Sequence, residues 1–181
     1  MFTAAALIIG AQGVYYSIGT PWLKTMGLSG SQIFIAWTIG FITEALAFRY
    51  SNALMPRHYC IVIPMVGMCF ILRAFLIWDS PGLTQAVVSF VLQGVTFSIP
   101  HAAFVISIRR FFSIRYSATG TSLYFAVAHG IGITIFSGTS GLILDLYGGL
   151  AWALPVVSGV IGCVVWMVSY KTPVIKNSAD T

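Results

Sequence analysis

Four ionisable side chains lie inside long apolar stretches of the sequence: Glu44, Arg73, His101 and His129. A lone charged side chain at the centre of a membrane helix costs about 2.5–3.5 kcal/mol on insertion scales, so such groups usually face a cavity and pair. A titratable acid beside a guanidinium that keeps its charge is the combination that proton or ion coupling requires. These residues therefore indicate a polar cavity that takes part in proton or ion coupling. The structural alternative is a static ion pair between Glu44 and Arg73 that holds two helices together.

The neighbours of these residues sharpen the interpretation. Glu44 shares one helix face with Trp37, because the two are seven residues apart. His101 follows Pro100, and a proline inside a helix removes one backbone hydrogen bond and kinks the axis. Freed carbonyls beside a membrane histidine are typical of the interrupted helices that line transporter sites. We therefore expect a working role for His101 and structural hydrogen bonding for His129, which lies among small residues.

The first apolar stretch carries Gln12 and the adjacent Tyr15 and Tyr16. These side chains line a cavity, or else the tyrosines pack or anchor the helix at the membrane interface. The residue types alone leave both interpretations open.

The composition sets the class of protein. Of 181 residues, 58% are hydrophobic and 7% are charged, whereas a soluble domain has about 25% charged residues. A soluble enzyme, a nucleic-acid binder and a disordered chain are excluded, because the nine basic residues are spread between apolar runs and form no patch. The cysteines show no CxxC spacing and are expected to be packing residues, so we predict no disulfide, metal or cofactor; they are Cys60, Cys69 and Cys163.

The chain contains six long apolar runs, and a membrane helix needs about 20 apolar residues. The runs are continuous rather than alternating, which favours helices over barrel strands. The sequence therefore predicts an all-α membrane protein with six transmembrane helices over residues 1–170, followed by a tail at 171–181. The predicted spans are residues 2–23, 31–48, 59–78, 84–108, 117–146 and 150–170.

The basic residues between the runs predict the orientation, since cytoplasmic loops carry an excess of lysine and arginine. The opposite loops hold only Lys24. We therefore expect a multi-pass protein of the cell (inner) membrane with both termini and the tail in the cytoplasm. The seven bases on the predicted cytoplasmic side are Arg49, Arg57, Arg109, Arg110, Arg115, Lys171 and Lys176.

The segment Gly138-Thr139-Ser140-Gly141 resembles the GxSG nucleophile motif of rhomboid intramembrane proteases, which also have six-span cores. That chemistry needs a histidine from another helix beside the serine. In rhomboids the histidine comes from a later span, and no histidine follows residue 129. A protease is therefore a minor alternative, and we do not expect an enzyme.

The predicted spans and buried charges, over about residues 5–170, resemble the C-terminal six-helix half of a major facilitator superfamily transporter. The chain is most similar to the group around the 3-phenylpropionate permeases, with the lactose permease and nucleoside/proton symporters as relatives. The residues that carry the resemblance are Gly13-Val14-Tyr15-Tyr16-Ser17, Trp37-Thr38-Ile39-Gly40 followed by Glu44, Arg73 within Ile71–Ala74, His101-Ala102-Ala103 and Arg109-Arg110.

The resemblance implies a secondary active transporter that works by alternating access and couples a small organic solute to protons. By position, Glu44 resembles the acid that links the substrate and proton sites of the lactose permease, while Arg73 and His101 resemble its buried arginine and histidine. That permease has a glutamate three residues after the histidine, where this chain has Phe104. The resemblance therefore places the coupling proton on Glu44 or His101.

The substrate that suits these residues is an aromatic acid. Arg73 would meet its carboxylate while Trp37 and Tyr16 contact its ring. Together with Gln12, these residues form the predicted substrate-binding set.

Facilitators join two six-span halves and bind substrate between them near the midplane. The first predicted span is equivalent to the seventh of such a protein and begins directly after Met1. We therefore expect a fragment, a half that pairs with another six-span unit, or a homodimer. A structural or assembly membrane protein, in which the buried charges hold helices together, is the alternative from another class.

Overall fold

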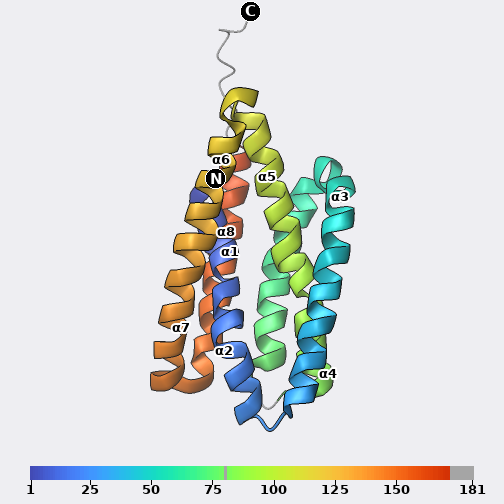
Figure 1. Cartoon of the computed structure of the whole chain (residues 1–181), viewed down its shortest axis with the longest axis vertical. Coiled ribbons are helices and arrows are strands. Elements are labelled where there is room, and N and C mark those ends of the chain that lie inside the picture. The colour runs from blue at the N-terminus through green and yellow to red at the C-terminus, as the bar shows by residue number, and fades with distance from the viewer. Residues whose placement is uncertain (80, 172–181) are drawn as a thin grey trace, which may run out of the picture.

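The computed structural model describes residues 1–79 and 81–171, and it describes the side chains of these residues except for those of 52–60, 110, 170 and 171. Within these ranges the chain is helical and contains no strand. The helices run side by side along one long axis, and the N-terminus lies toward the same end as the last residues of α8 (Figure 1). Residues 172–181 of the predicted tail lie outside the described residues.

The first predicted span consists of two helices placed end to end, α1 (Phe2–Gly10) and α2 (Gln12–Thr25). A short connection follows, in which Gly27 has a φ of 90°. The next helix, α3, begins after Ser29, whose hydroxyl accepts from the backbone of Gln32 while the Gln32 side chain accepts from the backbone of Ser29. This reciprocal cap satisfies two N–H groups that a helix start otherwise leaves unpaired.

The helix α3 (Gly30–Trp78) contains two of the predicted spans. Its chain reverses direction about halfway, yet the backbone is helical throughout (Figure 1). The loop expected between residues 48 and 59 is therefore helical. The connecting residues include no glycine, which is the residue that most often ends a helix.

The fourth predicted span is interrupted. It consists of α4 (Leu83–Val91), a π-helical turn at Gly94–Ser98 and α5 (Ile99–Phe111). The fifth is similar, with α6 (Ser117–Tyr124), a π-helical segment at Phe125–Ile133 and α7 (Thr134–Tyr147). Short π-helical insertions often mark functional sites, and both of these carry or adjoin polar residues inside an apolar run.

The chain reverses once more between α7 and α8 (Ala153–Lys171). At the turn Gly148 has a φ of 58°, a conformation that glycine adopts without a steric penalty. Over the described residues, five helical stretches are long and apolar enough to cross a membrane: Phe2–Thr25, Gly30–Ser51, Ile61–Trp78, Leu83–Arg109 and Ile114–Ser169. The last has 56 residues and includes the turn at Gly148. The structure thus confirms an all-helical protein with several membrane-length helices.

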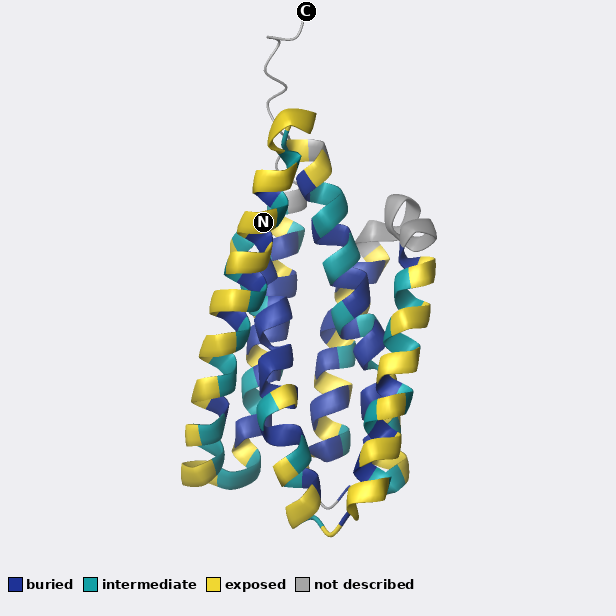
Figure 2. Cartoon of the chain, in the orientation of Figure 1, coloured by how far each residue is buried: buried dark blue, intermediate teal, exposed yellow. Residues whose placement is uncertain are grey.

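The core lies along α1 and α2, which are buried along most of their length while the first half of α3 presents exposed residues outward (Figure 2). Two glycines allow α1 to approach the π-helical segment closely. A Cβ added to Gly132 would lie 2.8 Å from the carbonyl oxygen of Ala6 and 3.3 Å from Cα of Gly10. The small residues of this region therefore bring backbones together, as such residues do between membrane helices.

The serine of the GTSG segment has a packing role in the interface between α7 and α2. Ser140 is fully buried, its hydroxyl lies 2.6 Å from that of Ser17 on α2, and it donates to the carbonyl of Ser137. No hydrogen bond to a histidine is found for Ser140 among the described side chains. Among these side chains, the serine therefore has no base of the kind that a nucleophile needs.

Candidate functional site

Arg73, on the second half of α3, is fully buried and surrounded by neutral oxygen atoms. Its Nε donates to the carbonyl of Ser89 at 3.0 Å, and one terminal nitrogen donates to the side-chain oxygens of Gln12, at 2.9 Å, and Thr96. The other terminal nitrogen donates to Oε1 of Gln93 at 3.4 Å. Four oxygen atoms from three helical segments therefore replace the water that the charge would have outside the membrane.

The aromatic ring of Tyr15 covers the guanidinium, with Cζ of Arg73 3.7 Å from the ring centroid. The negative face of an aromatic ring attracts a cation at this distance, and more strongly where water is excluded. Sequence reasoning named the neighbouring Tyr16 for substrate binding and left Tyr15 open. The structure places Tyr15 in the core, where it contacts Arg73.

Pro100 explains how Gln12 comes to be bound in this region. Because proline has no N–H, the carbonyl of Thr96 receives no α-helical hydrogen bond from residue 100. The amide nitrogen of Gln12 donates to this carbonyl at 3.1 Å, while its oxygen accepts from Arg73. The kinked fourth span thus supplies an acceptor that holds a side chain of the first span.

Glu44 is linked to Arg73 through Gln93. The Gln93 amide nitrogen donates to Oε2 of Glu44 at 2.9 Å, and its oxygen faces the guanidinium. The hydroxyl of Ser98 also donates to the backbone carbonyl of Glu44. No direct ion pair joins Glu44 and Arg73 in the part of the chain that the structure describes, so the static pair considered above is replaced by an amide bridge.

The bridge depends on a close approach between α3 and the fourth span. A Cβ added to Gly94 would lie 2.8 Å from the carbonyl oxygen of Thr43, and one added to Gly40 would lie 3.1 Å from Cβ of Phe90. Any larger residue at position 94 would push the two backbones apart. We refer to Gln12, Arg73, Ser89, Gln93 and Thr96, together with Glu44, as the arginine cluster.

The predicted aromatic contacts lie at the outer edge of this cluster. The ring of Trp37 is stacked with that of Tyr16 at a centroid distance of 5.9 Å and with that of Phe41 at 5.6 Å. Tyr16 is 37% exposed, whereas Arg73 has no exposed surface. A solute can therefore touch these rings in the observed conformation, but it can contact Arg73 only after Gln12 or Gln93 has moved.

His101 lies in a second cluster. Its Nδ1 is 2.8 Å from the hydroxyl of Tyr124 and 3.4 Å from Nε2 of His129. The imidazole also contacts the rings of Phe48 and Phe97 at centroid distances of 5.5 and 5.7 Å. We refer to His101, Tyr124 and His129, with the surrounding Phe48, Phe97 and Phe125, as the histidine cluster.

Phe104, the residue three positions after His101, is fully buried. It packs against Trp166 at 4.8 Å and Tyr124 at 6.0 Å. The position is therefore part of the apolar core, whereas Glu44 is a carboxylate that is connected through Gln93 to a buried cation.

Sequence reasoning overlooked several members of the two clusters. It predicted structural hydrogen bonding for His129 without naming a partner, and it gave Gln93, Thr96 and Tyr124 no role. The signal for Gln93 was present, because an amide inside an apolar run has to find polar partners. No sequence signal pairs His129 with His101, because the two lie on different spans and their contact depends on the π-helical segment.

The described residues contain no group of three or more histidine, cysteine, aspartate or glutamate side chains that could hold a metal ion. Cys69 is half-buried and Cys163 is buried, both as free thiols; the side chain of Cys60 lies outside the described residues.

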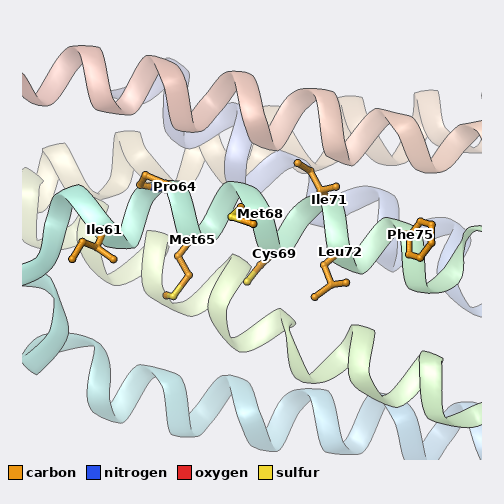
Figure 3. Close-up of a pocket in the computed structure, with 8 residues that line it drawn as sticks. All are labelled: Ile61, Pro64, Met65, Met68, Cys69, Ile71, Leu72 and Phe75. Carbon is orange, nitrogen blue, oxygen red and sulfur yellow. The ribbon is translucent and has the colours of Figure 1, made fainter.

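A groove of about 730 Å³ lies along the second half of α3 (Figure 3). It contains no charged side chain and none of the predicted site residues. Ligand sites for polar solutes combine apolar walls with a few placed polar groups, so this groove suits an apolar chain better than an acid. Its lining residues are Ile61, Pro64, Met65, Met68, Cys69, Ile71, Leu72 and Phe75.

Buried charge within membrane-length helices, joined by polar bridges between spans, is typical of membrane transport proteins. Comparison with known families gives the class: the MFS_1 like family matches residues 1–153. The chain belongs to this family, which confirms the resemblance to a half of a major facilitator transporter. It is therefore classed with transporters and not with enzymes, and the protease alternative is wrong.

A curated relative is the "Probable 3-phenylpropionic acid transporter" of Escherichia coli (strain K12). It is 26% identical over 159 residues, which are 84% of this chain and 40% of that protein. The chain thus spans about 40% of the length of the relative it matches. No solved structure matches the chain significantly.

Proposed function

We propose that the chain forms one half of a secondary active transporter that moves a small organic solute together with protons by alternating access. Its five membrane-length stretches become six crossings if Ile114–Ser169 crosses twice, which the reversal at Gly148 supports. The excess of basic residues at one end supports an orientation with both termini in the cytoplasm of a cell with an inner membrane.

One observation carries the proposal: the hydrogen-bonded path from the buried guanidinium of Arg73 through Gln93 to the half-buried carboxylate of Glu44. A carboxylate at the edge of a low-dielectric region gains or loses a proton with a large change in its interactions. Protonation of Glu44 would weaken the hydrogen bond from Gln93, because a charged acceptor binds a donor more strongly than a neutral one. Gln93 would then be freer to expose Arg73.

In this mechanism, in which protonation of Glu44 releases Gln93, each predicted residue has a role. Glu44 binds the proton, with His101 as the second proton-binding candidate on the neighbouring cluster. Tyr16 and Trp37 contact an aromatic ring, and Arg73 binds the carboxylate of the solute when Gln12 or Gln93 has moved aside. An aromatic acid such as 3-phenylpropionic acid, which appears in the name of the relative, is the first solute to test.

The partner is a second six-helix unit or a second copy of this chain, because substrate sites of this class lie between two such units. Photo-crosslinking from position 41, where the exposed Phe41 stacks on Trp37, tests the second copy. A crosslinked dimer in native membranes supports self-assembly, and a heavier adduct of different mass identifies another unit.

The test of coupling is uptake of labelled 3-phenylpropionate by cells that produce the chain, with and without an inward proton gradient. We expect gradient-driven uptake for the unchanged chain and its loss in Glu44→Gln, with both proteins equally abundant in the membrane. Asp145→Asn is the matched control, because Asp145 is an exposed carboxylate near the end of α7.

Two results would contradict the proposal. Gradient-driven uptake that survives Glu44→Gln would exclude this carboxylate as the coupling group. A Glu44→Gln protein that is merely lost from the membrane, while the unchanged chain moves no aromatic acid, would favour the structural alternative in which the buried charges hold helices together.

A further inference from the structure

The connection between α5 and α6 lies at one end of the bundle, the end toward which the N-terminus also lies (Figure 1). It separates two membrane-length stretches, because Leu83–Arg109 ends there and Ile114–Ser169 begins there. Phe112 and Ser113, within this connection, are not helical. Backbone without regular hydrogen bonds does not lie exposed in the hydrocarbon of a membrane. The connection is therefore placed at the boundary between lipid and water, within reach of lipid headgroups.

This connection is strongly basic. It contains Arg109, Arg110 and Arg115, while no acidic residue occurs between Asp79 and Asp145. The side chains of Arg109 and Arg115 are exposed. A guanidinium keeps its charge and can bind a phosphate group through two parallel hydrogen bonds. The sequence around these arginines supplies no acid of its own, so the charge of the connection suits an anionic partner.

A pocket of about 780 Å³ lies against the connection and is lined by Arg109, Ile114, Ser117, Ala118 and Thr121. The Thr121 hydroxyl donates to the backbone carbonyl of Ser117. The hydroxyl of Ser117 makes no hydrogen bond of its own in the described part of the chain, so it can donate to a ligand. The pocket thus combines a permanent cation, a hydroxyl donor and an apolar wall, which suits a phosphate that is attached to apolar chains.

Large apolar side chains surround the arginines without being covered by protein. Ile114, which lines the pocket, is 98% exposed, and Phe111 and Tyr116 are each more than half exposed. Apolar side chains beside basic ones are typical of segments that insert at the boundary between headgroups and acyl chains. They favour a lipid over a phosphate that is dissolved in water, because only the lipid offers them apolar contacts.

The inner side of the connection is fixed to the bundle. The ring of Phe112 packs against that of Phe2 at a centroid distance of 6.5 Å. A Cβ added to Gly120 would lie 2.9 Å from the side chains of both Phe112 and Ile108, so α5 and α6 approach closely here. Because the connection is held in place, little ordering is needed when a ligand binds.

We propose that the pocket at Arg109 and Ser117, assisted by the neighbouring Arg115, binds the phosphate of an anionic phospholipid while Ile114 and Phe111 contact its acyl chains. The bound lipid fixes the depth at which the ends of α5 and α6 lie in the membrane. Binding of this lipid does not depend on the proposed transport function.

The first experiment is native mass spectrometry of the purified full chain in a neutral detergent. Phosphatidylglycerol is compared with phosphatidylcholine that has the same acyl chains. We expect phosphatidylglycerol to be retained preferentially, and less so as the salt concentration rises. Arg109→Gln and Arg115→Gln should each weaken its binding about fivefold. Arg49→Gln is the matched control, because Arg49 is exposed near the end of another membrane-length stretch but does not line the pocket.

Two further variants separate a defined lipid site from diffuse attraction by charge. Ser117→Ala leaves every charge in place and should still weaken binding of phosphatidylglycerol several-fold, since a hydrogen bond to a charged group is lost. Ile114→Ser should also weaken it, whereas Leu146→Ser, at a 64% exposed position near the other end of α7, should not. Inorganic phosphate should fail to displace the lipid.

A second readout needs no variant. Phosphatidylglycerol with a photoreactive group beside its phosphate, in phosphatidylcholine vesicles that contain the unchanged chain, should label the peptide that spans residues 109–121. Variants are compared only where circular dichroism and elution volume match those of the unchanged chain.

Four results would overturn the proposal. They are equal retention of the two lipids, an equal loss of binding in Arg49→Gln and Arg109→Gln, displacement of the lipid by inorganic phosphate, and photolabelling that is confined to other peptides. The second result would indicate diffuse attraction, and the third would indicate a site for a dissolved anion.

Discussion

The arginine cluster and the histidine cluster solve the same problem, a polar group in an apolar surrounding, in opposite ways. Arg73 carries a permanent charge, and four neutral oxygens and an aromatic face cover it completely. His101 can be neutral, so one hydroxyl and one imidazole nitrogen suffice and the site stays half-open. A group that cannot give up its charge has to be enclosed, whereas a group that can do so is able to remain near the surface.

This difference predicts where the molecule tolerates change. Removing a donor or acceptor around Arg73 leaves its partner unpaired in a buried region, and such a loss costs more than the bond itself contributes. The histidine cluster loses less, because His101 and His129 are only half-buried. Glu44 belongs to the arginine cluster but lies at its edge. It is therefore connected to a buried charge, as the other members of the arginine cluster are, and it is half-exposed, as the histidines are.

The largest effect is expected for Arg73→Met. It removes the only cation of the cluster and leaves the side-chain oxygens of Gln12, Gln93 and Thr96 without the donor from which they accept. Breaking a buried charge network from one side typically costs about 3–5 kcal/mol, and we expect a loss of that size in the free energy of unfolding, measured by denaturant titration in detergent. Arg109→Met, at an exposed position, should stay within about 0.5 kcal/mol. Equal stability of the two variants would contradict the enclosed-charge interpretation.

A smaller effect is expected from exchanging the two ends of the bridge. Gln93→Glu places a second carboxylate within the 2.9 Å contact to Glu44, so the two acids repel and the protein is destabilised. The double variant, which also carries Glu44→Gln, again has one acid and one amide, but the acid is now at position 93, beside Arg73. We expect a coupling free energy of about 1–3 kcal/mol in the double-mutant cycle. Simple additivity of the two changes would mean that Gln93 does not connect Glu44 and Arg73.

The packing that holds the histidine cluster in place gives the third prediction. Gly132 lies three residues after His129 and touches the backbone of α1, whereas a Cβ added to Gly138 would meet nothing within 4 Å. We expect Gly132→Ala to reduce the unfolding free energy by about 1–3 kcal/mol through overpacking, while Gly138→Ala is neutral or slightly stabilising. Thermal unfolding in detergent separates them, and the reverse order would place the tight helix contact elsewhere.

The smallest effects are expected for two tyrosines, Tyr124 in the histidine cluster and Tyr15, which covers Arg73. The Tyr124 hydroxyl is hydrogen-bonded to His101, so Tyr124→Phe should cost about 0.5–1.5 kcal/mol. The Tyr15 hydroxyl is buried without a partner among the described side chains, and the ring alone contacts Arg73. Tyr15→Phe should therefore be neutral or stabilising. A larger loss for Tyr15→Phe would indicate that its hydroxyl has a partner such as a buried water molecule.

The sequence alone was enough to predict an all-helical membrane protein, the family and the burial of Arg73, because long apolar runs and isolated charges inside them have few physical explanations. It also predicted that Arg73 would find an anion, either Glu44 or a carboxylate of the substrate, and a joint action of Glu44 and Arg73 stays a prediction. It did not reveal Gln93 between them, since an amide at the right distance depends on the close approach of backbones at Gly94.

The partner of His101 could not be predicted for a related reason. Periodicity assumes 3.6 residues per turn, and the π-helical segment departs from that value over Phe125–Ile133. The helical connection within α3 was also missed, because the boundaries of the predicted spans came from hydropathy, which does not register helices that continue into polar sequence. The proton-coupling role of Glu44 and His101, the substrate and the orientation remain predictions.

Pro100 has an effect outside its own helix. It is an imino acid, so the fourth span has a spare carbonyl at Thr96, and Gln12 from the beginning of the chain is tethered there. Any other residue at position 100 would bring an amide hydrogen that competes for this oxygen. A mutation in one helix would then loosen a different one, and damage at Pro100 would first be detected as mobility around Gln12.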